Sequence, residues 1–298
     1  LYVFIDYMIT LFSQVNNAMT RVGDLERSRS AADHIFELLD EETVSNGDED
    51  APVSTGKITF ENVTFAYKDE DVLKDVSFEV KPNQTVAFVG HTGSGKSTIL
   101  NLLFAFYRPQ EGRILFEGVP LESLDCKSVR RQMAIVLQDP FLFTGTILSN
   151  INLNRDDISR ADAETALREV GGDLLLDRLE DGIDTKVNEK GEGFSSGERQ
   201  LISFARALAH NPRILVLDEA TSSIDSETES VIQKAMRKLE QGRTTLIIAH
   251  RLSTIKHADQ IIVLDHGRIA EQGVHDELIT KNGIYKSMYE SQSQEKLC

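Results

Sequence analysis

A glycine-rich loop at residues 90–97 narrows the folds that are open to this chain. The loop has the sequence Gly-His-Thr-Gly-Ser-Gly-Lys-Ser and matches the spacing G-x-x-x-x-G-K-[ST]. It follows an apolar run at 85–89 and precedes an apolar, helix-like run at 98–106, so we expect it to join a strand to a helix. Its glycines allow backbone N–H groups to converge on an anion at the positive end of that helix. The residues expected to hold phosphate are Gly90, Thr92, Gly93, Ser94, Gly95, Lys96, Ser97 and Thr98.

Two side chains of this phosphate loop have predicted roles of their own. Lys96 can reach the β- and γ-phosphates of a nucleotide, and the Ser97 hydroxyl can hold Mg²⁺. A glycine-rich turn beside a core helix is the alternative. The strand–loop–helix context makes that alternative the weaker one.

The rest of the chain alternates between apolar runs and helical stretches. Short continuous apolar runs are typical of strands buried on both faces of a parallel sheet. They occur at 86–89, 135–137, 214–217, 246–249 and 261–264, and helical stretches lie between them around 97–106, 161–170, 199–210 and 227–239. Residues 57–67 instead alternate apolar and polar, as half-buried antiparallel strands do. The order of elements predicts an α/β fold.

The N-terminal stretch differs from the rest. Apolar residues recur at helical spacing up to Leu39, and a continuous helix of that length would be about 58 Å long, with Gly23 as a candidate interruption. The first twelve residues are mostly apolar but carry Asp6, whereas a membrane span needs about 20. The end of a membrane helix and a soluble helix both remain open. Residues 37–50 then contain seven acids and no base, which predicts an exposed linker.

Charge and cysteine content exclude several classes of protein. The chain has 32 Lys and Arg against 48 Asp and Glu, a formal net charge of −16. General binding of nucleic acid needs clustered positive charge and is therefore not expected. Only Cys126 and Cys298 are present, far apart, which argues against a disulfide framework or a cysteine-bound zinc.

A second polar feature is the acidic end of the apolar run at 214–217. Asp218 and Glu219 follow it directly, and α/β sheets bind ligands at the carboxyl ends of their strands. Asp218 suits Mg²⁺ coordination, often through water, and Glu219 suits polarising an attacking water. Two acids that merely end a strand and cap the next helix are the alternative, which the phosphate loop upstream makes less favoured.

Three weaker signals lie near other strand and helix ends. His250 follows the apolar run at 246–249, and Gln138 follows the run at 135–137. A structural histidine and a turn residue are the ordinary interpretations of these two. Ser195 and Gly197 precede an amphipathic stretch, where they indicate either a second anion site at a helix N-terminus or an ordinary N-cap.

Together these residues resemble the nucleotide-binding domain of ABC transporters over about residues 56–290. Residues 90–97 correspond to the Walker A loop and 214–219 to the Walker B strand. The resemblance further places Gln138 on the Q-loop, His250 on the switch histidine, Asp225 in the D-loop and Tyr67 where the family stacks an aromatic ring on adenine. It implies that ATP and Mg²⁺ bind. It assigns Glu219, His250 and Lys96 to hydrolysis and Ser97, Gln138 and Asp218 to the metal.

The same resemblance implies a fold and a division into domains. The fold is that of a P-loop NTPase, with a RecA-like core, an antiparallel β subdomain and an inserted helical subdomain at about 139–208. We expect residues 1–40 to extend the last transmembrane helix, 41–55 to be the acidic linker and 56–298 to be the ATPase domain. Residues 137–151, 185–191 and 31–40 are similar to exporters. This implies a missing N-terminal membrane domain, a location at the cell membrane with the ATPase on the cytoplasmic side, and a second ATPase domain as partner.

The transported substrate stays open among drugs, lipids and peptides. Two rival classes also remain: a soluble ABC ATPase of DNA repair or translation, and a regulatory module that holds ATP without hydrolysing it. The acidic balance argues against the first of these classes. Glu219 and His250 argue against the second.

One motif departs from the family pattern. The family signature is Leu-Ser-Gly-Gly-Gln, and residues 194–198 of this chain are Phe-Ser-Ser-Gly-Glu. In the family, two domains enclose two ATP molecules, each between one domain's Walker A and the other's signature. Glu198 adds negative charge and Ser196 a side chain near the partner's nucleotide, which predicts one half of a heterodimer with unequal sites.

Overall fold

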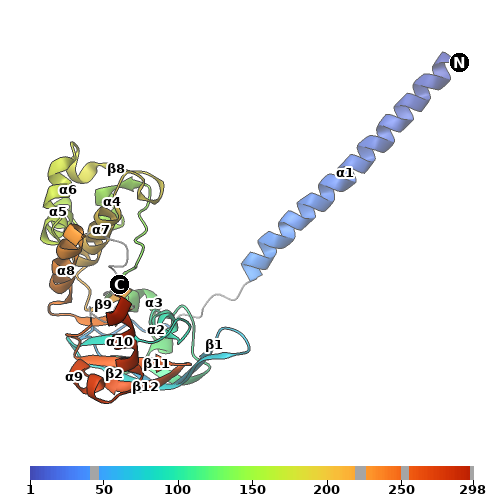
Figure 1. Ribbon diagram of the computed structural model, residues 1–298. Coiled ribbons are helices and arrows are strands. Elements are labelled where there is room, and N and C mark those ends of the chain that lie inside the picture. The colour runs from blue at the N-terminus through green and yellow to red at the C-terminus, as the bar shows by residue number, and fades with distance from the viewer. Residues whose placement is uncertain (41–46, 219–225, 250–254, 296–298) are drawn as a thin grey trace. The chain divides into compact units, whose positions relative to one another are not determined.

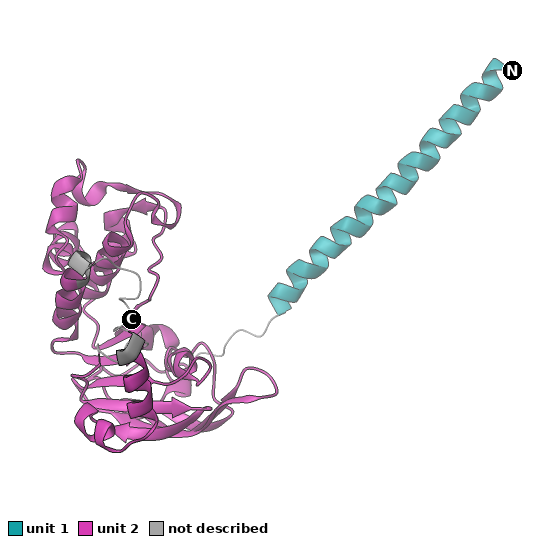
Figure 2. Ribbon diagram, in the orientation of Figure 1, with its two compact units in different colours: residues 1–45 teal, residues 46–298 magenta. Residues whose placement is uncertain are grey.

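The computed structural model describes residues 1–40, 47–218, 226–249 and 255–295. It divides into two compact units, residues 1–45 and 46–298 (Figure 2). The first unit consists of helix α1 (Tyr2–Asp40). The strands of the second unit are β1 (Ile58–Ala66), β2 (Asp71–Val80), β3 (Thr85–Val89), β4 (Glu111–Phe116), β5 (Val119–Pro120), β6 (Met133–Val136), β7 (Gly145–Thr146), β8 (Lys186–Val187), β9 (Ile214–Asp218), β10 (Thr244–Ile248), β11 (Gln260–Asp265) and β12 (Arg268–Gly273). Its α-helices are α2 (Lys96–Leu103), α3 (Cys126–Arg130), α4 (Ile147–Asn152), α5 (Arg160–Glu169), α6 (Asp173–Arg178), α7 (Ser196–Ala209), α8 (Ser226–Glu240), α9 (His275–Thr280) and α10 (Ile284–Glu295).

A six-stranded sheet in the order β12-β11-β3-β10-β9-β6 forms the centre of the second unit. All of its strands except β12 run parallel. Side chains alternate between two hydrophobic clusters: Ala87 and Val89 of β3 pack with residues of α5, α7 and α8, whereas Val86 and Phe88 pack with β1, β2 and α2. The sheet is therefore buried on both faces, and the predicted α/β fold is confirmed.

Strand β6 is an exception to that burial. The apolar run at 135–137 was expected to be a fully buried strand, but β6 ends at Val136 and pairs only with β9 at the edge of the sheet. Ile135 is 37% and Leu137 is 42% exposed. An edge strand lacks a neighbour on one side, so apolar side chains there reach the surface.

A second, antiparallel sheet has the order β2-β1-β4-β5. Strand β1 pairs with β2 and β4, as the alternating pattern at 57–67 predicts. Phe60 of β1 stacks on Phe78 of β2 at 4.5 Å between ring centroids, and Phe78 in turn contacts Phe88 of β3. These rings join the two sheets in one core.

Helices α4 to α8 gather on the side of the central sheet that is opposite the antiparallel sheet (Figure 1). Helix α7 is the centre of this helical region and packs against α4, α5 and α8. Its Ile202, Phe204 and Ala205 side chains are completely buried. This packing holds α7 in place and thereby positions the segment 194–198, whose sequence differs from the family signature.

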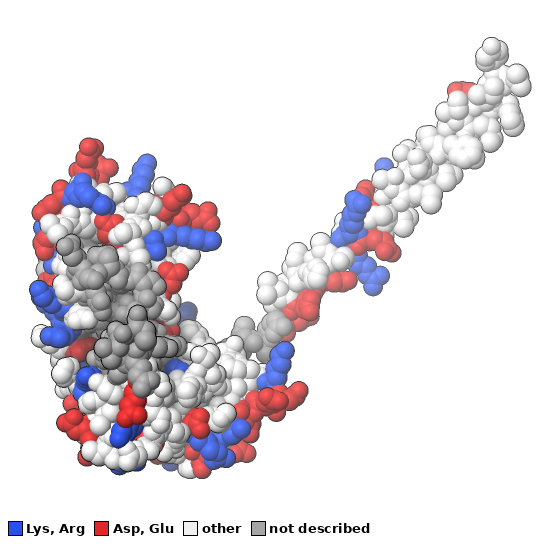
Figure 3. Space-filling view, viewed as in Figure 1, with Lys and Arg blue, Asp and Glu red and all other residues white. Residues whose placement is uncertain are grey.

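Helix α1 is continuous through Gly23, so the predicted interruption does not occur. Glycine lowers helix stability by about 1 kcal/mol but can adopt helical φ and ψ, so one glycine need not break a long helix. No residue of α1 is buried. Its first half is almost free of charge and its second half carries charges of both signs (Figure 3). Within the described ranges, no helix has an 18-residue window apolar enough to cross a bilayer.

The described part of the predicted acidic linker is attached to the ATPase unit, although its acids are exposed as predicted. Residues 47–55 are held by the ATPase unit: Glu49 bridges to Leu124, and Ser54 is only 3% exposed. The carboxylate of Glu117 accepts hydrogen bonds from the Ser54 hydroxyl and from the backbone N–H groups of residues 55–57. Composition correctly predicted that Asp48, Glu49 and Asp50 are exposed, but it does not show that Glu117 holds the segment that follows them.

Candidate nucleotide-binding site

The phosphate loop connects β3 to α2, as its flanking apolar runs predict. Gly90 has φ +154° and Gly95 has φ +104°, values that residues with a side chain rarely adopt. A Cβ at Gly90 would lie 2.2 Å from the carbonyl oxygen of Leu264, and one at Gly95 would lie 2.6 Å from Leu73. Only glycine fits at either position, so both glycines shape the loop.

The buried face of the loop offers several donors to an anion. Lys96 is 6% exposed, and its ammonium donates to the carbonyl oxygens of Gly90 and His91 at 2.8 and 2.9 Å. Ser94 Oγ is buried and has no hydrogen-bond partner among the described residues. Gly95 has no side chain with which to cap α2, so the first N–H groups of this helix are left for a ligand. A buried ammonium, an unsatisfied hydroxyl and a helix N-terminus together fit a polyphosphate.

Tyr67 lies next to this loop although 29 residues separate it from Lys96. Its hydroxyl accepts from Asn101 Nδ2 at 2.8 Å and lies 3.3 Å from Thr98 Oγ1, both on α2. Edges of Phe65 and Tyr107 support the ring at centroid distances of 4.8 and 5.0 Å. The residue is 44% exposed, so part of its surface is available to a base that would stack beside phosphates held by the loop.

Asp218 and Gln138 lie, like the loop, at the carboxyl ends of the parallel strands. Asp218 ends β9 opposite Ile248 of β10, which in turn lies opposite Phe88 of β3. The Asp218 backbone is therefore about 10 Å, two strand spacings, from β3. Gln138 is exposed and follows the neighbouring strand β6. A carboxylate, an amide oxygen and the Ser97 hydroxyl are the hard oxygen ligands that Mg²⁺ prefers.

Three predicted residues lie outside the described part of the chain: Glu219, Asp225 and His250. Ala249, which precedes His250, donates its N–H to the carbonyl of Phe88 at 3.1 Å. The chain thus leaves β10 between the strands that carry the phosphate loop and Asp218.

Ser195 is the N-cap of α7. Its hydroxyl accepts the N–H of Glu198 at 3.2 Å, and the Glu198 carboxylate accepts the N–H of Ser195 at 2.8 Å, which is a capping box. Neither Ser195 nor Gly197 has a hydrogen bond to residues 90–98 in the described part of the chain. The structure thus shows the N-cap; the second anion site would need a nucleotide brought by another molecule.

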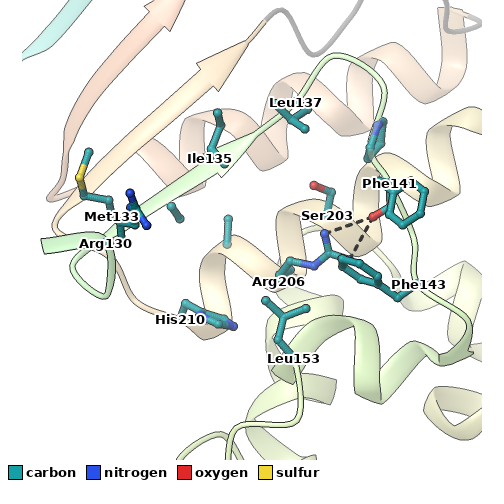
Figure 4. A pocket seen from close by; sticks show the side chains of 13 residues that line it. Arg130, Met133, Ile135, Leu137, Phe141, Phe143, Leu153, Ser203, Arg206 and His210 are labelled. Atoms are coloured by element: carbon teal, nitrogen blue, oxygen red, sulfur yellow. Dashed lines mark hydrogen bonds between the residues drawn. The ribbon is translucent and has the colours of Figure 1, made fainter. Parts of the chain in front are cut away.

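A groove lies between the segment after β6 and the side of α7 (Figure 4). It has a volume of about 380 Å³, and its walls include the exposed apolar residues Leu137, Phe141 and Phe143. Arg206 donates to the carbonyl oxygens of Phe141 and Asn150, and burial lowers the pKa of its guanidinium. The side chains that line the groove include two arginines and a histidine but no acid.

The sequence did not indicate the residues that hold the candidate site residues in position. Asn101 holds Tyr67, Arg178 pairs with Glu198, and Arg206 ties α7 to the segment after Gln138. The i+3 spacing of Asn101 from Thr98 puts both on one face of a helix, which is a usable signal. No spacing in the sequence indicates the other two contacts.

The architecture defines the class of protein. A parallel sheet carries a glycine-rich phosphate loop after one strand and an acid at the end of another, with a third strand between them, so the chain is a P-loop NTPase. A family model described as ABC transporter matches residues 73–222. The chain belongs to this family, and residues 46–298 contain its ATP-binding domain.

Known proteins similar to the chain are exporter components. It is 51% identical over 298 residues to the "Probable multidrug resistance ABC transporter ATP-binding/permease protein YheH" of Bacillus subtilis, covering 99% of this chain and 44% of that protein. It is 44% identical over 287 residues to the "ATP-dependent lipid A-core flippase" of Legionella pneumophila, covering 96% of the chain and 49% of that protein. A solved structure of a bacterial Atm1-family ABC exporter with ATP bound matches with a TM-score of 0.82 at 42% identity, over 90% of this chain and 47% of that one. The chain spans less than half the length of each.

Proposed function

We propose that this domain hydrolyses ATP and thereby drives export by a membrane protein of which it is one part. The observation that carries the proposal is the phosphate loop, where Lys96 and the unsatisfied Ser94 Oγ are buried next to the uncapped start of α2. The names of the relatives, which refer to multidrug resistance and to a lipid A-core flippase, support export without fixing the substrate. Drugs, lipids and peptides therefore remain open.

In the proposed mechanism the loop binds and orients the triphosphate. Backbone N–H groups of α2 and the Lys96 ammonium offset the charge that develops on the transferring phosphoryl group. Tyr67 stacks on adenine and so places the phosphates along the loop. Mg²⁺, held by Ser97 and Asp218 with Gln138 at the same sheet edge, would supply further charge neutralisation on the phosphate oxygens.

Proton handling falls to residues at the ends of β9 and β10. We assign Glu219 to polarise the attacking water and His250 to stabilise charge on the γ-phosphate. Asp218 immediately precedes Glu219, and Ala249 immediately precedes His250, and both lie at the edge that carries the loop. A non-hydrolysing regulatory domain would not need a glutamate and a histidine at these two strand ends.

The site also needs a second ATP-binding domain. Ser195 and Gly197 lie at the start of α7 in the helical region, and we propose that they contact ATP held by that partner, with Asp225 at the same interface. The departures at Ser196 and Glu198 continue to predict a partner of different sequence and two unequal sites.

The groove and α1 support a link to a permease portion. The groove has apolar walls and a lining with two arginines and no acid, which suits an apolar segment that carries negative charge. Helix α1 buries none of its residues, and its first half is almost free of charge. We propose that α1 continues a membrane helix and that the ATPase lies on the cytoplasmic side of the cell membrane.

Lys96→Ala tests the proposed activity. We expect steady-state ATP hydrolysis by the full-length protein to fall by at least about 100-fold, since a charge-assisted contact to the transferring group is lost. Lys57→Ala is the matched control, because Lys57 forms an exposed ion pair with Glu79 at 3.0 Å on β2. Equal turnover in the wild type and Lys96→Ala would contradict the proposal.

A further inference from the structure

Glu198 occupies the position where the related signature has a neutral glutamine. Its carboxylate Oε2 accepts the N–H of Ser195 at 2.8 Å, while its own N–H donates to Ser195 Oγ. The Ser195 hydroxyl proton is not used by this capping box. The N–H groups of Ser196 and Gly197 have no partner in the part of the chain that the structure describes. The start of α7 therefore keeps donors for an anion.

The carboxylate nevertheless creates an electrostatic difficulty. Glutamine can form the same capping box without a charge. A full negative charge at the start of α7 would repel a triphosphate that approaches it. The repulsion grows when two domains close and exclude water, because the effective dielectric constant falls.

Arg178 lies at the C-terminal end of α6 and offsets this charge. Its Nη2 is 2.7 Å from Glu198 Oε1, the oxygen that the capping box leaves available. The Glu198 side chain is 18% exposed, whereas the carboxylates paired with Arg160 and Arg168 in the same helical region are 39–70% exposed. Arg178 itself is 57% exposed, so the pair lies at the surface and its carboxylate is the more shielded member.

We propose that Arg178 neutralises Glu198 and thereby keeps the start of α7 able to approach the γ-phosphate of ATP on a partner domain. The pair replaces the neutral glutamine with two opposite charges. Arg178 is a positioning residue, because it acts through Glu198 and not on the nucleotide. This inference rests on the proposed function.

A double-mutant cycle in the full-length protein, assembled with its partner domain, tests the pair. We expect Arg178→Ala to lower kcat/KM for ATP by about fivefold, because it exposes the nucleotide to an uncompensated charge. In a Glu198→Gln background the same substitution should change kcat/KM by less than about twofold. The defect of Arg178→Ala should also shrink as salt is raised, which the loss of a purely structural contact would not produce.

Arg168→Ala is the matched control, since Arg168 pairs with Glu164 on α5 and with Asp173 and Asp177 on α6 but not with Glu198. We expect it to leave kcat/KM unchanged. An equal loss from Arg178→Ala in both backgrounds, or no loss in either, would overturn the role of Arg178. If Lys96→Ala also left turnover unchanged, the proposed function itself would fail and this inference with it.

Discussion

At the scale of the residue, Tyr67 makes a testable connection between the base and the phosphate loop. Tyr67→Ala should weaken ATP binding by about tenfold or more, because base–aromatic stacking contributes about 1–3 kcal/mol. Tyr67→Phe keeps the ring but loses the hydrogen bond from Asn101, so we expect a smaller loss. Equilibrium binding of ATP, compared with that of inorganic triphosphate, distinguishes stacking on the base from contacts with the phosphates. If Tyr67→Ala weakened both ligands equally, the ring would not stack on the base.

Single residues differ in how far the sequence predicts them. The motif spacing indicated Lys96 and Ser97, because the loop's chemistry needs those residue types at those positions. Tyr67 came from resemblance alone, and its contacts with Thr98 and Asn101 are visible only in the structure. The ion pair of Glu198 with Arg178 joins two helices, so no local pattern could indicate it.

At the scale of the element, the start of α7 can be compared with the start of α5, which has the same kind of cap. Ser195 and Ser159 are both N-caps in capping boxes. Replacing either serine by alanine should lower the free energy of unfolding by about 1 kcal/mol. Only Ser195→Ala should also lower ATP turnover. Chemical denaturation and a turnover assay together measure both effects, and equal turnover in the two variants would remove Ser195 from the site.

Glu117 holds the segment that enters the ATPase unit, and its contribution should depend on pH. Burial acts to raise its pKa, but hydrogen bonds from Thr55, Lys57, Ser54 and Gly56 outweigh burial and lower it. A lowered folded-state pKa means that the carboxylate stabilises the fold above its unfolded-state pKa and loses this effect as pH falls through the folded-state value. Glu117→Gln should therefore flatten the decline of unfolding free energy in acid. An unchanged acid profile would contradict this role.

The elements were predicted best where burial follows a simple period. The continuous apolar runs of β3, β9, β10 and β11 correctly indicated strands buried on both faces. The run at 135–137 was misjudged because hydrophobicity does not distinguish a central strand from an edge strand. The acids at 48–50 are exposed as predicted, but no local pattern indicated that Glu117, about 60 residues away, accepts hydrogen bonds from the segment that follows them.

At the scale of the whole molecule, the chain is an ATP-binding domain of the ABC transporter family with a long N-terminal helix. The sequence predicted this class because six motifs occur in the family's order. The predicted inequality of two sites depends on Ser196 and Glu198. If Arg178 neutralises Glu198, the inequality must come mainly from the added side chain of Ser196.

The most direct test of ATP hydrolysis between two closing domains is Glu219→Gln in the full-length protein. Turnover and the population of closed dimers would be measured together in ATP and Mg²⁺. We predict that the variant binds ATP, that hydrolysis falls by at least about 100-fold because the water is no longer polarised, and that closed dimers accumulate. Undiminished hydrolysis in this variant would contradict the account.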